Sequence, residues 1–319
     1  MPSAIRSTFA LSLAVSSVLG ATYHSAEHIV GAGFYDSFNF EAIPDPTHGR
    51  VNYVDEATAR STNLTFSSDD TFILRADHTT VLNPAGAGRN SVRIASKKAY
   101  STHVSVFDMA HMPQGCGTWP AVWETNEALW PTGGETDILE GVNDQGTNQV
   151  TLHTSPGCTV PAARDMTGTA LNLDCDTAVA GNAGCGVKLS QATSYGPAFN
   201  ANGGGWYATE RTNSFISVWF WPRNDPAVPA DVKAGGGSVD TDNWGTPSAT
   251  FPSTTCDIEE HFAAHNIIIN LTFCGDWAGQ APIYASSGCP STCNDFVNTN
   301  PAAFANAFFE FNAINVYTS

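Results

Sequence analysis

The chain has 319 residues, of which only 13% are charged, and its formal net charge is −17 at neutral pH. An acidic surface of this kind repels phosphate backbones and anionic lipid headgroups, which argues against nucleic-acid and membrane-surface partners. A neutral or cationic substrate is expected. The length would permit two domains, but no linker or internal repeat divides the sequence, and a large β-sandwich can reach this size as one domain.

Residues 1–20 carry one basic residue near the start, Arg6, then a short apolar run and small residues at the end. This order is typical of a secretory signal and is too short for a membrane span. We therefore expect residues 1–20 to be a signal peptide and residues 21–319 to be a single exported, soluble domain. The sequons at Asn63 and Asn270 fit surface glycosylation in that compartment.

Alternating polar and apolar residues, rich in β-branched and aromatic side chains, recur along the chain. These stretches occupy residues 91–96, 103–107, 147–153, 215–221 and 266–273. Helical periodicity is missing, apart from a turn or two around residues 301–307. The pattern predicts an all-β scaffold whose concave face forms a groove with long loops, at residues 154–205, 222–260 and 275–303.

Polar and aromatic residues in the middle of the chain are candidates for ligand binding. Arg93 alternates with apolar neighbours on its strand, so it faces away from the apolar side. Trp119, Trp123 and Trp130 fall within twelve residues, which is more tryptophan than a core normally needs. Indole rings are good platforms for the apolar C–H faces of sugars, and their N–H group adds a polar handle. His153 ends a predicted strand shortly afterwards.

The segment 134–141, Gly-Glu-Thr-Asp-Ile-Leu-Glu-Gly, carries three carboxylates in an otherwise apolar, β-prone stretch. Glycoside hydrolysis requires two carboxyl groups that face one glycosidic bond, one to protonate the leaving oxygen and one to attack or to activate water. This chemistry is our leading interpretation of Glu135, Asp137 and Glu140. The alternative is a set of acids on a solvated strand edge.

The spacing of these acids makes a structural prediction. In a regular strand Glu135 and Asp137 share one face while Glu140 points to the other. Both glutamates can face one cleft only if an extra residue is absorbed between Asp137 and Glu140. We therefore predict a β-bulge near residues 138–139, because bulges re-aim side chains beside active sites.

Eight cysteines form an even set in a chain expected to be exported, which favours four disulfides. Six of them fall in the three long loops, which they would tether. Their pairing is left open. The spacing of Cys289 and Cys293 lacks the second pair or the histidines that a zinc site requires, so we expect no structural zinc.

The runs TWPAVW, ALWPTGGETDILEGVND, TLHTSPGC and CGDWAG resemble glycoside hydrolase family 16, most closely the secreted fungal laminarinase-type endo-1,3(4)-β-glucanases. The resemblance covers residues 21–319. It implies a concanavalin A-like jelly-roll β-sandwich of two antiparallel sheets, with β-glucan lying across the concave face. It also implies hydrolysis of β-1,3 and mixed-linkage β-1,3-1,4 glucan with retention, by double displacement. This chemistry requires no cofactor or metal, and we expect a monomer.

The same resemblance implies roles for individual residues. Glu135 matches the nucleophile, Asp137 the assisting carboxylate and Glu140 the general acid and base. Five positions separate the two glutamates, as in laminarinases, whereas lichenases and cell-wall transglycosylases have four. The residues implied to bind the sugar are Trp123, Trp130 and Trp277 on the glycone side, Trp119 nearby, and Arg93 and His153 as hydrogen-bond partners of hydroxyl groups.

Two other functions stay open at this stage. A lectin-like module with the same fold would hold β-glucan without cutting it, although such a module needs no closely paired acids. A β-glucan transglycosylase would pass the glycosyl group to a sugar hydroxyl instead of water. The sequence leaves linkage preference and branch tolerance undecided.

Overall fold

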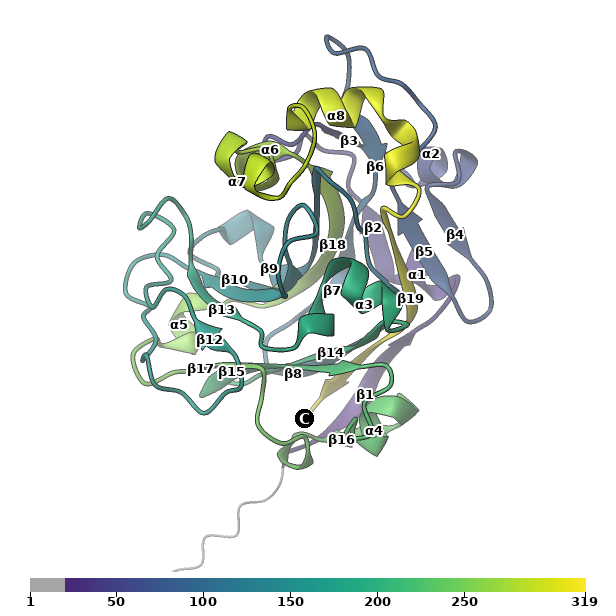
Figure 1. Cartoon of the computed structure of the whole chain (residues 1–319). Helices are drawn as coiled ribbons and strands as arrows, with labels where there is room; N and C mark the ends of the chain where they lie inside the picture. The colour runs from purple at the N-terminus through teal and green to yellow at the C-terminus, as the bar shows by residue number, and fades with distance from the viewer. Residues whose placement is uncertain (1–20) are drawn as a thin grey trace, which may run out of the picture.

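The computed structural model describes residues 21–319, so the expected signal peptide lies outside the described residues. Two large antiparallel sheets, one of eight strands and one of nine, lie one over the other (Figure 1). A short parallel pair, β3 (Val51–Tyr53) and β6 (Arg89–Ser91), stands apart from them. The predicted all-β scaffold is confirmed.

The eight-stranded sheet contains the strand with the three acids near its centre. Its order is β12-β13-β11-β10-β9-β18-β7-β2. The strands are β12 (Thr169–Ala170), β13 (Cys185–Lys188), β11 (Gln149–His153), β10 (Glu135–Glu140), β9 (Thr118–Thr125), β18 (His265–Phe273), β7 (Arg93–Tyr100) and β2 (Phe38–Phe40).

The nine-stranded sheet brings the first and last described strands together. Its order is β16-β1-β19-β8-β14-β15-β17, with β5 pairing β19 and β4 pairing β5. The strands are β16 (Ser238–Asp240), β1 (Thr22–Ile29), β19 (Phe308–Thr318), β8 (His103–His111), β14 (Gly205–Arg211), β15 (Phe215–Pro222), β17 (Ala249–Pro252), β4 (Thr65–Ser67) and β5 (Phe72–Arg75).

The main core fills the space between the two sheets. Val122 and Ile269 reach it from the eight-stranded sheet, and Phe107 and Val218 reach it from the nine-stranded sheet, all fully buried. Each such side chain contributes roughly 1.5–3 kcal/mol through the removal of apolar surface from water. The alternation of strands then sends the next residue on each strand to the opposite face.

The outer face of the nine-stranded sheet is also covered. Trp206, Trp219 and Trp221 pack there in a second apolar cluster, together with Val232 from α4 (Ala230–Ala234). Both faces of the nine-stranded sheet are therefore covered by packed side chains. A site on a sheet face is expected on the outer face of the eight-stranded sheet instead.

The helices are short. The longest, α8 (Cys293–Thr299), has seven residues. In Figure 1, α6, α7 and α8 gather at one end of the sandwich near β18. The others are α1 (Gly33–Ser37), α2 (Glu56–Ser61), α3 (Gly196–Ala201), α5 (Ile258–His261), α6 (Gly275–Ala278) and α7 (Ala281–Ser286), with 3-10 turns η1 (Glu127–Leu129), η2 (Ala192–Ser194), η3 (Thr241–Asn243) and η4 (Pro301–Phe304). The turn expected around residues 301–307 is η4. Within residues 21–319, no helix is long and apolar enough to cross a membrane.

The prediction of four disulfides is confirmed. They tie the long loops to the sandwich and to one another, and neither Cys289 nor Cys293 pairs with the other. The bonds are Cys116–Cys289, Cys158–Cys256, Cys175–Cys185 and Cys274–Cys293. The described residues contain no free cysteine that could ligate zinc.

The expectation of surface glycosylation fails at one of the two sequons. Asn63 is exposed, in the turn after α2. Asn270 is buried on β18, where it accepts a hydrogen bond from Trp123 Nε1 at 2.8 Å and its amide contacts the Tyr53 hydroxyl at 3.2 Å. A sequon states only which residues are present and carries no information on burial, so the prediction for Asn270 is wrong.

Candidate active site

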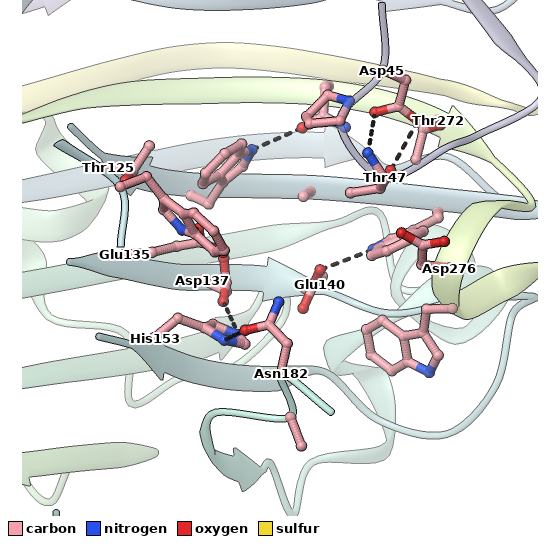
Figure 2. A pocket seen from close by; sticks show the side chains of 18 of the residues that line it. Asp45, Thr47, Thr125, Glu135, Asp137, Glu140, His153, Asn182, Thr272 and Asp276 are labelled. Carbon is pink, nitrogen blue, oxygen red and sulfur yellow. Dashed lines mark hydrogen bonds and ion pairs between the residues drawn. The ribbon is translucent and has the colours of Figure 1, made fainter. Parts of the chain in front are cut away.

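A pocket of about 830 Å³ lies on the outer face of the eight-stranded sheet. Figure 2 shows Glu135, Asp137, Glu140 and His153 pointing into the same space. All nine residues named from the sequence line this pocket, namely Arg93, Trp119, Trp123, Trp130, Glu135, Asp137, Glu140, His153 and Trp277.

The predicted bulge is present in β10. The register between β10 and β9 shifts between Asp137 and Leu139. Ile138 is the extra residue, and both it and Leu139 are fully buried in the core. Two consecutive side chains therefore point inward, and Glu140 returns to the pocket face alongside Glu135. The geometric prediction from the spacing is confirmed.

The side chain of Asn148 holds the bulge in place. Its Oδ1 accepts a hydrogen bond from the Glu140 backbone N–H at 2.8 Å, and its Nδ2 donates to the Ile138 carbonyl at 2.8 Å. Asn148 is fully buried. One amide thus satisfies two backbone groups that the bulge removes from the regular ladder, and it fixes the residue from which Glu140 projects.

A tight turn fixes the other end of β10. Gly134 has φ +75°, and a Cβ there would lie 2.5 Å from the Phe262 ring, so only glycine fits. The Thr125 hydroxyl donates to the Gly134 carbonyl at 2.7 Å, and His265 Nε2 lies 2.7 Å from the Gly133 carbonyl. Burial lowers the pKa of His265 to about 4, so the ring is neutral and donates there.

Two tryptophans bind the two glutamates directly. Trp119 Nε1 donates to Glu140 Oε1 at 2.8 Å, and Trp130 Nε1 donates to Glu135 Oε2 at 2.6 Å. Trp130 remains 44% exposed, and Trp277 meets Trp119 edge to face with centroids 5.7 Å apart. Each indole pairs its N–H with a carboxylate and leaves ring surface toward the pocket, which suits contact with a sugar face.

Burial raises the pKa of two carboxyl groups in the site. Burial raises the pKa of Glu140 to about 7, although the Trp119 hydrogen bond and the His153 charge oppose the shift. Burial also raises the pKa of Asp137 well above its ordinary value, and the charges of Glu135 and Glu140 add to that effect. Both shifts favour the protonated form, and a carboxyl group that keeps its proton can act as an acid on a bond in the pocket.

His153 sits between two oxygen atoms. Its Nε2 lies 3.4 Å from Asp137 Oδ2, and its Nδ1 lies 3.0 Å from Asn182 Oδ1. Burial by itself lowers the pKa of His153, but the contact with Asp137 and the charges of Glu135 and Glu140 outweigh it and raise the pKa to about 10. The imidazole is therefore a cation under ordinary conditions.

Glu135, Asp137 and His153 each offer one ligand atom, and these atoms lie within 4.8 Å of one another. A metal ion would need the lone pair of a neutral imidazole. Because the carboxylates keep His153 protonated, the donor set fits an ion pair and a shared proton better than it fits a metal.

Arg93 is on the pocket side of β7, as its alternation predicts, but it is largely buried. Its Nε contacts Glu41 Oε2 at 2.7 Å, and its Nη2 pairs with Glu127. The guanidinium also lies 5.0 Å from the centroid of the Trp123 ring. Two acidic residues therefore compete with any sugar hydroxyl for this side chain, and Arg93 also supports the Trp123 platform.

Other residues that line the pocket were not predicted from the sequence to be site residues. Asn270 and Thr272 face the pocket from β18, and the Thr272 hydroxyl donates to Asp45 at 2.6 Å. The period-two pattern of residues 266–273 could have predicted Asn270 and Thr272, because both alternate with buried apolar residues. Asn182 lies in a loop and Asp276 lies in the four-residue helix α6, and neither segment is long enough or regular enough to give a periodic signal.

The comparison with known protein families agrees with this geometry. A family model described as the XgeA-like, catalytic GH16 domain matches residues 38–317. The chain belongs to glycoside hydrolase family 16. The family resemblance drawn from the GETDILEG segment is thereby confirmed.

Named relatives of this family 16 chain are fungal. A probable glycosidase of Schizosaccharomyces pombe is 42% identical over 299 residues, which cover 93% of this chain and 69% of the relative. A probable endo-1,3(4)-β-glucanase of Aspergillus clavatus is 44% identical over 306 residues, which cover 93% of this chain and 46% of the relative. The chain thus spans about half to two thirds of the length of these relatives.

Solved family 16 structures match the whole sandwich. Laminarinase 16A from Phanerochaete chrysosporium, solved with 6-O-glucosyl-laminaritriose in donor and acceptor sites, is 64% identical with a TM-score of 0.93, covering 93% of this chain and all of that one. An elongating β-1,3-glucosyltransferase is 39% identical with a TM-score of 0.86, and the match covers 93% of this chain and 100% of that one. The predicted jelly-roll fold is confirmed.

Proposed function

We propose that residues 21–319 form one catalytic domain that hydrolyses β-1,3 and mixed-linkage β-1,3-1,4 glucan internally, with retention of configuration. One observation carries the proposal: the bulge in β10 turns Glu135 and Glu140 to the same face of a pocket lined with tryptophans. The fungal relatives named as endo-1,3(4)-β-glucanases, and a laminarinase that holds a β-glucan oligosaccharide, support the substrate class.

In the first chemical step Glu140 donates its proton to the glycosidic oxygen while the Glu135 carboxylate attacks the anomeric carbon. The bond to the leaving sugar breaks, and a glycosyl ester forms on Glu135. A pKa of about 7 leaves Glu140 protonated below neutrality, where it can act as this acid.

In the second step the same residue acts as a base. Esterification removes the negative charge of Glu135, so Glu140 loses a neighbour that had raised its proton affinity. Ionised Glu140 takes a proton from water, the water oxygen attacks the anomeric carbon, and the ester bond to Glu135 breaks. Two inversions give net retention.

Asp137 and His153 would offset the negative charge that Glu135 and Glu140 place in the pocket. The raised pKa of Asp137 gives it a proton to share with Glu135, which lies on the same face of the strand. Cationic His153 balances the negative charge of the cluster. Trp119, Trp123, Trp130 and Trp277 are proposed as sugar platforms, and Arg93 and His153 as partners of sugar hydroxyls, all lining the pocket.

A second function deserves a test because one solved neighbour is described as an elongating β-1,3-glucosyltransferase. The glycosyl ester would be the same in both reactions, and only the acceptor, a sugar hydroxyl or water, would differ. A lectin-like role has weaker support, since a binding module has no use for two carboxyl groups aimed at one space.

The setting of the proposed enzyme is extracellular. Four disulfides suit an oxidising compartment. We propose a secreted monomer whose partner is β-glucan polysaccharide, consistent with the earlier expectation that nucleic acid and membranes are not partners.

The decisive experiment is product analysis on laminarin. Short oligosaccharides with new reducing ends support hydrolysis, products longer than the substrate support transfer, and unchanged laminarin supports binding alone. Glu135→Ser should lower kcat by about 10⁴-fold or more because no ester can form.

Glu140→Ala provides the matched control for the assigned roles. With an aryl laminaribioside, whose leaving group needs little protonation, the variant should form the glycosyl ester on Glu135. Hydrolysis of that ester should then be slow, because no base activates water. Added azide should attack the anomeric carbon, release Glu135 and give a β-glycosyl azide. If Glu135→Ser stays active and azide restores nothing to Glu140→Ala, the two roles are wrongly assigned.

A further inference from the structure

The loop between Cys175 and Cys185 carries Asn182, a pocket residue that has no role in the proposed reaction. Asn182 is exposed at the rim of the pocket, whereas the two cysteines are fully buried and bonded to each other. Cys185 begins β13 and lies opposite Leu152 of β11, one residue before His153. The disulfide therefore closes the loop immediately beside the histidine.

Asn182 contacts the one ring nitrogen of His153 that does not face the carboxylates. Its Oδ1 lies 3.0 Å from Nδ1, while Nε2 faces Asp137 Oδ2 at 3.4 Å (Figure 2). An amide oxygen can only accept a hydrogen bond, so His153 Nδ1 must carry a proton in this contact. Nε2 faces Asp137 as an ion-pair contact, and the nearby acidic groups favour the doubly protonated imidazolium.

The loop is built to keep that contact. Ala180, Gly181 and Asn182 all have positive φ, at 49°, 67° and 65°, and asparagine tolerates this conformation better than most residues. Gly184 has φ +60°, and a Cβ there would lie 2.8 Å from His153 Cε1. The backbone at Gly184 thus packs against the ring edge that the side chain of Asn182 leaves free.

The charged groups that act on His153 all come from one strand. They are Glu135, Asp137 and Glu140 of β10. From the Cys175–Cys185 loop the ring meets only the neutral Asn182 amide and the Gly184 backbone. The loop therefore acts through hydrogen bonding and packing, not through charge.

We propose that Asn182 is a positioning residue whose side-chain oxygen keeps His153 doubly protonated and aimed at Asp137, so that the disulfide loop sets how protons are shared among the three carboxyl groups. The inference rests on the proposed glucanase function for its catalytic meaning. The contact itself concerns only the free protein and can be tested without substrate.

The test begins with an NMR titration of the His153 ring nitrogens in the wild type and in Asn182→Ala. The wild type should keep both N–H groups above pH 8, whereas the variant should lose one proton at a midpoint lower by about one pH unit. Asn172→Ala is the matched control, because Asn172 is another exposed asparagine that lines the same pocket and makes no hydrogen bond to a histidine within residues 21–319. Its titration should equal that of the wild type.

Kinetics on laminarin then separate positioning from sugar contact. Asn182→Ala should lower kcat about tenfold with little change in KM, because Asp137 loses a fixed cationic partner. Asn182→Asp, which restores an oxygen acceptor, should regain most of kcat and give a His153 midpoint no lower than that of the wild type.

Three results would overturn the inference: an unchanged His153 midpoint in Asn182→Ala, a rise in KM alone, or equal losses in the Ala and Asp variants. The last two would instead make Asn182 a direct sugar contact through its Nδ2. If the wild type releases no sugar from laminarin, the proposed function fails while the titration still decides the role of Asn182.

Discussion

The pairing of an indole N–H with each proposed catalytic carboxyl group would make the tryptophans part of the acid chemistry. Trp119 binds Glu140, and Trp130 binds Glu135. A hydrogen bond donated to a carboxylate favours the ionised form, so Trp119 holds the pKa of Glu140 below the value that burial alone would give. The residues proposed to bind the sugar therefore also set when the acid is charged.

This arrangement predicts the pH dependence of the reaction. The general acid must be protonated, and the pKa of Glu140 is about 7, so kcat/KM should fall as the pH rises through about 7. Trp119→Phe keeps an aromatic ring but removes the N–H donor that lowers the pKa. Its alkaline limb should therefore move to higher pH, as measured by kcat/KM on laminarin from pH 4 to 9.

Trp277→Phe serves as the control, because Trp277 lines the same pocket and no hydrogen bond joins its indole to Glu140 in the described structure. It should change KM and leave the alkaline limb in place. The role given to the Trp119 indole would be contradicted if the alkaline limb of kcat/KM in Trp119→Phe were unchanged or moved to lower pH.

Sequence alone could predict those residues whose type and strand position both carry information. The three acids, the tryptophans and His153 stand out by chemistry, and Arg93 by alternation on its strand. Asn182 could not be predicted, because it lies in an irregular loop and asparagine is common in loops. The burial of Arg93 between Glu41 and Glu127 likewise depends on segments far apart in sequence.

At the scale of one strand, the bulge in β10 determines whether the two glutamates can act together. If β10 ran as a regular strand without the bulge, Leu139 would face the pocket and the side chain of Glu140 would point into the core. Asn148 stabilises the bulge, because its side chain forms hydrogen bonds with the Glu140 N–H and the Ile138 carbonyl, the two backbone groups that the bulge leaves without strand partners. A local irregularity and one buried amide thus position the proposed general acid.

Asn148→Ala should leave the Ile138 carbonyl and the Glu140 N–H without partners in a buried setting. The expected loss in free energy of unfolding is about 2–4 kcal/mol, since each unpaired group costs about 1–3 kcal/mol. We also expect kcat to fall at least tenfold while KM changes little, measured by urea unfolding and by laminarin kinetics.

Asn148→Asp is the informative companion variant. A carboxylate can still accept from the Glu140 N–H but cannot donate to the Ile138 carbonyl, so an intermediate kcat is expected. If both variants lose stability and keep full kcat, the bulge would be maintained by the strand pairing alone.

The strands were predictable because alternation over five or more residues is a strong signal. Residues 103–107, 215–221 and 266–273 all fall within β8, β15 and β18. The short helices were not, because four to seven residues span at most two turns and show no periodicity. The long loops proved to contain β12, β13, β16 and β17, short strands whose pairing depends on tertiary contacts.

Over the whole molecule, two disulfides illustrate different uses of the same bond. Cys158–Cys256 closes a loop of 98 residues, whereas Cys175–Cys185 closes one of 10. In the chain-entropy model the first should contribute about 4.7 kcal/mol to stability and the second somewhat under 3 kcal/mol. The shorter one gains its importance from its place beside His153.

Paired Cys→Ala variants should therefore separate stability from activity. Removing Cys158–Cys256 should cause the larger drop in free energy of unfolding, followed by urea unfolding. Removing Cys175–Cys185 should cause the larger drop in kcat on laminarin, measured below the melting temperature of both variants. The opposite order in either measurement would contradict this division of roles.

The position of β19 has a consequence for how the protein is made. This last strand lies between β1 and β8 in the nine-stranded sheet, so the sheet cannot close until residues 308–318 have been synthesised. At roughly 5–20 residues per second, a ribosome needs about 15–60 seconds to travel from β1 to β19. During that time β1, β5 and β8 all lack the partner that β19 provides, so three strand edges stay open to wrong pairing until the last strand arrives.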